Sequence, residues 1–128
     1  MEKMDEEKQR MAYESYFYKQ QLGAVKKEME RITLTMLDIT NAVKTIDSMK
    51  KTDSLVPIGG NAFIETKLSS ERVLVPIGGG YVLKMDREMA KTEMEKRAES
   101  TKKVIEKLQN EYERMVNMIN DLERRIRE

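Results

Sequence analysis

Apolar residues recur at alternating steps of three and four along the first fifty residues of the chain. In heptad lettering they fill two series, with Met4, Met11, Tyr18, Val25, Ile32, Ile39 and Ile46 at d and Leu22, Met29, Met36 and Val43 at a. This spacing is typical of the buried seam of a coiled-coil helix. The stretch contains no proline and only one glycine, Gly23. The pattern therefore predicts a long helix over residues 1–51.

The same rhythm returns at the end of the chain, over residues 86–128. Its apolar or small positions are Met94, Ala98, Thr101, Ile105, Leu108, Tyr112, Met115, Ile119, Leu122 and Ile126. This stretch also lacks glycine and proline, and Asp86 is placed to cap its first turn. We predict a second coiled-coil helix here.

Residues 52–85 differ from both helical stretches and contain an internal repeat. Leu55 to Gly60 reads LVPIGG, and the same six letters recur nineteen residues later, from Leu74 to Gly79. A short apolar run follows each copy, at 62–64 and 81–83. Strand, glycine turn and strand, twice over, predict two β-hairpins. The expected fold is mainly α: one domain, a long antiparallel two-helix coiled coil with a central insert of four short strands.

A compact insert between two equal helices lets them fold back antiparallel, with opposed residue numbers that sum to about 138 (from the expected proximity of Lys50 and Glu88). Apolar residues then meet apolar residues along most of the seam, and Val25 lies opposite Tyr112 and Met115. Beside the insert, Ile46 lies opposite Lys91 and Met94, so we expect the seam to loosen there. Both chain ends lie at the far tip, where the first ten residues extend past the second helix.

Composition excludes several classes of function. The chain has neither cysteine nor histidine, which excludes disulfides, zinc–thiolate sites and histidine acid–base chemistry. Its 24 basic and 23 acidic residues nearly cancel, so bulk charge supports neither nucleic-acid nor membrane-surface binding. The lysines at 102, 103 and 107 alternate with glutamates, as on a solvated face.

Enzyme chemistry and membrane insertion are not expected either. The glycine turns lack the Gly-Lys-Ser/Thr of a phosphate-binding Walker loop, and each precedes a strand-like run. We therefore predict a non-enzymatic protein without cofactor or metal. The first ten residues have no apolar core, and no run approaches the ~20 residues of a membrane span. We predict a soluble, cytoplasmic protein.

Two surfaces are candidates for function. Two-stranded hairpins are marginal alone, so the insert predicts an oligomerisation platform; the alternative is that both hairpins fold onto the base of their own coiled coil. At the tip, Tyr13, Tyr16 and Phe17 fall at the outward positions f, b and c. Exposed aromatics beside flexible methionines favour binding of other proteins. Packing on another subunit, or no role, are the alternatives.

The heptad helix, the repeated VPIGG insert and the second heptad helix together resemble prefoldin over the whole chain, specifically its α class with two hairpins. The resemblance implies a hexamer of two α-type and four β-type subunits. Such a hexamer holds non-native polypeptides between coiled-coil tips without ATP and delivers them to a group II chaperonin. A filament-forming or scaffold coiled-coil protein of the same family, assembled through its hairpins, is the alternative.

The resemblance also suggests residues for each role. Carried onto this sequence, the assembly residues are Leu55, Val56, Ile58, Phe63, Ile64, Val73, Val75, Ile77, Val82 and Leu83. The client-binding tip, which rests on geometry alone, comprises Met4, Met11, Tyr13, Tyr16, Phe17, Leu122 and Ile126.

Overall fold

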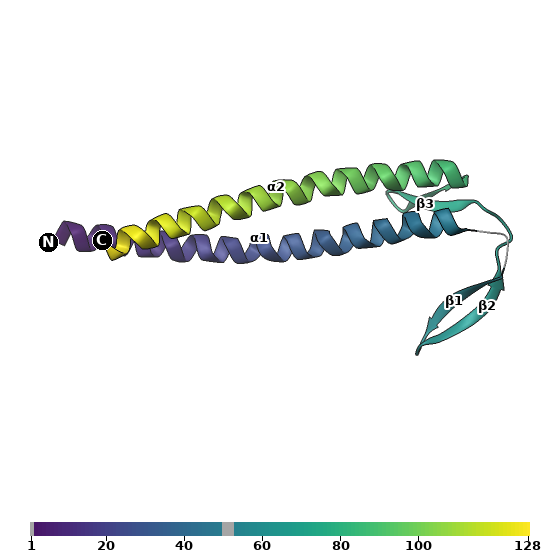
Figure 1. The fold of residues 1–128 in the computed structure, drawn as a ribbon, viewed down its shortest axis with the longest axis horizontal. Helices are drawn as coiled ribbons and strands as arrows, with labels where there is room; N and C mark the ends of the chain where they lie inside the picture. The colour runs from purple at the N-terminus through teal and green to yellow at the C-terminus, as the bar shows by residue number, and fades with distance from the viewer. Residues whose placement is uncertain (1, 50–52) are drawn as a thin grey trace. The chain divides into compact units, whose positions relative to one another are not determined.

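The computed structural model describes residues 2–49 and 53–128, with side chains from Asp5 onward. Its elements follow the predicted order (Figure 1): α1 (Glu2–Ser48), β1 (Asp53–Gly59), β2 (Ala62–Lys67), β3 (Val73–Gly78), β4 (Tyr81–Met85) and α2 (Arg87–Arg127). The predicted fold class, two long helices around two strand pairs, is confirmed. The first helix ends at Ser48, and residues 50 and 51, predicted as its end, lie outside the described residues.

The chain divides into two compact units. The terminal unit comprises residues 1–37 together with 99–128, and the hairpin unit comprises residues 38–98. In the terminal unit the two helices run antiparallel, and the start of α1 reaches beyond the end of α2 (Figure 1). Lys19 on α1 pairs with Glu123 on α2, and Met29 shares a groove with Tyr112. In both pairs the α2 residue lies about one helical turn beyond the position that was predicted to face its α1 partner.

In the hairpin unit the predicted register holds, because Asp47 pairs with Lys91 at 2.8 Å. The core of this unit consists of Ile46, Val75, Met85 and Ala90, and Val73 and Met94 pack against it. The expectation that the seam loosens near the insert is wrong. The hairpin β3–β4 supplies Val75 and Met85 to this end of the coiled coil, and these side chains bury Ile46.

The two hairpins are separate two-stranded antiparallel sheets with equivalent turns. The central turn residues Gly60 and Asn61 have φ of 58° and 60°, and Gly79 and Gly80 have 61° and 80°. Positive φ at both central positions defines the type I′ turn, whose twist matches that of the flanking strands. Asparagine tolerates this left-handed region, so Asn61 replaces glycine in the first copy.

The helix ends that face the insert carry specific caps. Asp86 accepts a hydrogen bond from the backbone N–H of Met89 at 2.8 Å, which confirms it as the N-cap of α2. The last turn of α1 has no basic residue of its own. Arg87 from the start of α2 instead donates to the carbonyl oxygens of Met49, at 3.2 Å, and of Asp47. The cation therefore satisfies carbonyl groups that the helix end leaves unpaired.

Candidate functional site

The start of α1 displays three aromatic rings on its outer side. Tyr13, Tyr16 and Phe17 are 75%, 60% and 53% exposed. They are outward because the seam passes through Ser15 and Tyr18, which leaves positions f, b and c to solvent. Helical contacts hold two of the rings in place. The ring of Phe17 meets that of Tyr18 edge-on at 6.3 Å, and Gln20 donates to the Tyr16 hydroxyl at 2.7 Å.

The facing end of α2 contributes less exposed apolar surface than predicted. Leu122 is buried in the seam together with Met115 and Ile119, so its assignment to the client-binding surface is not supported by its position. The reason is that the helix pairing reaches this far, and an inward heptad position is closed by the partner helix. Met11 and Ile126 are half-buried, and the side chain of Met4 lies outside the described part.

An ion pair links the two helices close to the aromatic cluster. The Lys19 ammonium lies 2.5 Å from the Glu123 carboxylate and holds the pKa of that carboxyl below its ordinary value, first by hydrogen bonding and then by charge attraction. Within α2, Asp121 pairs with Arg124 and Arg125, three and four residues further along the same helix. The pair of Lys19 with Glu123 favours closed helices beside the rings, although an exposed pair of this kind contributes little.

Some outward residues escaped the sequence analysis. Leu34 and Leu37 on α1 are 67% and 56% exposed. Their exposure could have been predicted from the heptad phase, because these leucines occupy positions f and b, like Tyr13 and Tyr16. Ser15 was also missed: it is buried at an a position, where a polar residue interrupts the apolar series.

The two hairpins expose apolar residues to different extents. In β1–β2, the five predicted assembly residues Leu55, Val56, Ile58, Phe63 and Ile64 are all exposed. In β3–β4, Ile77, Val82 and Leu83 are exposed, whereas Val75 is fully buried within its own chain and Val73 packs against the same core. Val75 and Val73 therefore contribute to the internal core rather than to a free surface.

The internal repeat explains why the two hairpins differ. Nineteen residues before Val73 and Met85, whose side chains reach the core, the first copy has Ser54 and Thr66. The hydroxyl oxygens of these two residues lie 2.8 Å apart and form a hydrogen bond across the strand pair. A polar pair at this place lacks the apolar surface that anchors the second copy. The second hairpin has a further anchor, since Arg97 donates to the carbonyl of Pro76 at 2.6 Å.

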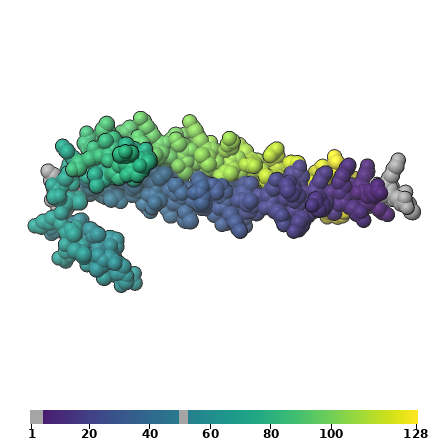
Figure 2. Space-filling model, turned by 180° about the vertical axis from the view of Figure 1, so that it is seen from behind, coloured from purple at the N-terminus to yellow at the C-terminus, as the bar shows by residue number. Residues whose placement is uncertain are grey.

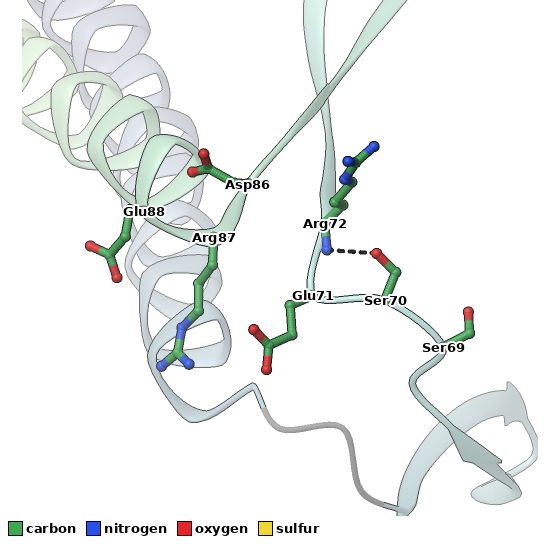
Figure 3. Close-up of a pocket in the computed structure, with 7 residues that line it drawn as sticks. All are labelled: Ser69, Ser70, Glu71, Arg72, Asp86, Arg87 and Glu88. Carbon is green, nitrogen blue, oxygen red and sulfur yellow. Dashed lines mark hydrogen bonds between the residues drawn. The ribbon is translucent and has the colours of Figure 1, made fainter.

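A polar cavity of about 560 Å³ lies between the linker of the hairpins and the start of α2 (Figure 3). It is lined by Ser69, Ser70, Glu71, Arg72, Asp86, Arg87 and Glu88. Its groups already have structural roles: Asp86 and Arg87 cap the helix ends, and the Ser70 hydroxyl accepts from the N–H of Arg72 at 3.0 Å. We assign this cavity to the architecture of the hairpin unit.

The described residues offer neither a metal-binding cluster nor a membrane span. Among the described residues, no group of three or more histidine, cysteine, aspartate or glutamate side chains is placed to hold a metal ion. A search of the same part of the chain finds no helix long and apolar enough to cross a membrane. What this part of the chain does present is apolar surface on a coiled coil and on two strand pairs. Exposed apolar surface of this kind is typical of proteins that contact other polypeptides.

Comparison with known proteins identifies the family. The family model described as "Prefoldin subunit" matches residues 18–128. Prefoldin subunit alpha of Methanococcus aeolicus is 27% identical over 129 residues, covering 96% of this chain and 90% of that protein. Prefoldin subunit alpha of Pyrococcus horikoshii is 23% identical over 134 residues, covering 100% and 90%. The chain belongs to the prefoldin family, a non-enzymatic family of molecular chaperones whose members assemble with partner subunits.

A solved structure supports the fold. The filamentous prefoldin of Methanocaldococcus jannaschii superposes with a TM-score of 0.69 at 21% identity, covering 84% of this chain and 93% of that one. The α-class resemblance expected from the repeated insert is thus confirmed by archaeal relatives named as alpha subunits.

Proposed function

We propose that the chain is a subunit of an ATP-independent holdase that captures non-native polypeptides at the tip of its coiled coil. The observation that carries this proposal is the exposed cluster of Tyr13, Tyr16 and Phe17 in a member of a chaperone family. Unfolded chains expose apolar side chains, and aromatic rings offer large contact areas for them. Several tips acting on one client would make weak contacts sufficient through avidity.

The test is suppression of aggregation of a chemically unfolded protein by the assembled complex, without nucleotide. The variant Tyr13→Ser/Tyr16→Ser/Phe17→Ser should lose most of this activity while keeping helix content and mass. The control, Lys27→Ser/Asn41→Ser/Lys44→Ser, costs at least as much helix propensity at exposed outward positions and should suppress like wild type. Wild-type activity in the triple aromatic variant would contradict the tip assignment.

We further propose assembly through the hairpins with β-type subunits, in a hexamer of two α-type and four β-type chains. The exposed faces of both hairpins support it, because uncovered apolar strand pairs favour association. Ile58→Asp with Ile77→Asp introduces one charge into each exposed face and should reduce the mass of the complex. Circular dichroism should show unchanged helix content. An unchanged mass by light scattering would exclude these faces as the platform.

Filament formation is the second candidate, and the structural likeness to a filamentous prefoldin favours its consideration. Light scattering of the purified chain separates the two outcomes. A low-mass species that grows only when β-type subunits are added supports the hexamer, and a concentration-dependent ladder of masses supports the filament. Delivery of clients to a group II chaperonin is part of the proposal on family grounds and is tested by client transfer from the loaded complex to that chaperonin.

A further inference from the structure

The outer side of α1 carries two apolar patches at equivalent heptad positions. The first contains Tyr13 and Tyr16, and the second contains Leu34 and Leu37, which lie 21 residues further along the same helix. Three heptads bring a coiled-coil helix back to the same face, so both patches point to the same side. At 1.5 Å per residue they lie about 31 Å apart. Figure 2 shows one side of α1, purple to blue, uncovered along the terminal unit.

The second patch borders a groove that reaches the partner helix. Leu34 lines it with Met29 and Thr33 of α1 and Tyr112 of α2, and its volume is about 530 Å³. The Thr33 hydroxyl is bonded to the Met29 carbonyl at 2.7 Å, so this polar group is already satisfied. Lys26 and Glu30 flank the groove with opposite charges. A pocket of this size accepts a few apolar side chains.

The surface between the two patches decides what kind of occupant fits. Its outward positions hold Gln20, Gly23, Ala24, Lys27, Glu30 and Arg31, which are polar or nearly without side chain. A helix from another protein that packed along this side of α1 would need apolar residues of α1 at every turn, as in a coiled-coil seam. A folded partner would need about 800 Å² of contact on each side, far more than two pairs of side chains offer. A flexible chain that touches both patches and crosses the gap needs neither.

We infer that Leu34, Leu37 and the adjoining groove form a second client subsite, which binds the same extended, non-native segment that the aromatic tip holds. This inference rests on the proposed holdase function. An extended chain rises about 3.3 Å per residue, so two apolar groups separated by about nine residues span the two patches. The subsite selects segments with that spacing and holds them along the helix instead of at its end alone.

The experiment measures binding of fluorescein-labelled peptides to the full-length chain by anisotropy. The peptides have a Gly/Ser/Gln background and carry one leucine pair, two pairs four residues apart, or two pairs nine residues apart. The four-residue spacer spans too little to join the patches. We expect the nine-residue peptide to bind about tenfold tighter than the other two, because its second contact is intramolecular.

Leu34→Gln/Leu37→Gln should abolish this advantage, so that the nine-residue peptide binds no tighter than the four-residue peptide. Glutamine has a helix propensity close to that of leucine, so the helix is retained. The control Asn41→Gln/Lys44→Gln, one heptad further along, should bind all three peptides like wild type.

Unchanged affinity and unchanged spacing dependence in the leucine variant would overturn the inference. If Tyr13→Ser/Tyr16→Ser/Phe17→Ser still abolished binding of the one-pair peptide in that case, the proposed holdase function would stand. Failure of every peptide to bind wild type would overturn both. A fall in the mass of the wild-type assembly caused by the leucine substitutions would identify the patch as a contact between copies of this chain and overturn the subsite.

Discussion

Val75 and Val56 allow a direct test of the different roles of the two hairpins. They occupy the same place in the two copies of the repeat, but Val75 is 0% exposed and Val56 is 46% exposed. Valine to alanine removes the same two methyl groups at both sites, from strand pairs of equivalent register. The difference between Val75→Ala and Val56→Ala therefore isolates the docking of the second hairpin on the coiled coil.

The magnitude follows from burial. Two buried carbon groups contribute about 1.6 kcal/mol, and the cavity left beside Ile46, Met85 and Ala90 raises the loss to about 2 kcal/mol. At the half-exposed position the same deletion should cost less than about 1 kcal/mol. Arg97, which binds the carbonyl of Pro76, is untouched by either change and keeps the hairpin in place.

The assay is urea unfolding of the chain without partner subunits, followed by far-ultraviolet circular dichroism. Because Val75 shares its core with both helices, its truncation should shift the unfolding midpoint of the helical signal. Hydrogen exchange of the β3–β4 amides should rise in Val75→Ala and stay at the wild-type level in Val56→Ala. Equal losses of stability in the two variants, or none in Val75→Ala, would refute the docking of the second hairpin.

Two further predictions concern contacts between the helices. Arg87→Met should lower the free energy of unfolding by about 1–2 kcal/mol and increase hydrogen exchange in the last turn of α1, because carbonyl groups there lose a charged donor. The control Arg72→Met should do neither, since the side chain of Arg72 points away from the helices in Figure 3. The lowered pKa of Glu123 means that its pair with Lys19 stabilises the fold fully above the ordinary carboxyl pKa of about 4.3, and that this contribution is lost as the pH falls through the lower folded value. Urea titrations at a series of pH values should therefore show that acid lowers the free energy of unfolding less in Lys19→Met than in wild type. In the exposed control Lys27→Met, acid should lower it as much as in wild type. The same pH dependence in both variants would contradict the linkage.

The periodic features of the chain were readable in advance because they depend on local spacing. The seam residues predicted on α2, from Met94 to Ile126, are all buried or half-buried in the structure. The repeated glycines predicted both turns, since positive φ is a property of the turn residues themselves. The outward position of Tyr13, Tyr16 and Phe17 follows from the same heptad phase, which also placed Leu34 and Leu37 outward, although their significance was missed.

What the sequence by itself determined is thus the set of elements: two heptad helices, two hairpins with matching turns, and the exposed aromatic tip. Only the tertiary structure decided which hairpin docks, how far the helix pairing reaches past Leu122, and which side chains close over Ile46. The two hairpins share six identical residues, but only the second docks, because it carries Val73 and Met85. These side chains stabilise docking by packing on an apolar surface formed by residues distant in the chain. Heptad spacing acts within a few turns of helix, whereas burial of a strand face is a long-range contact that no local pattern contains.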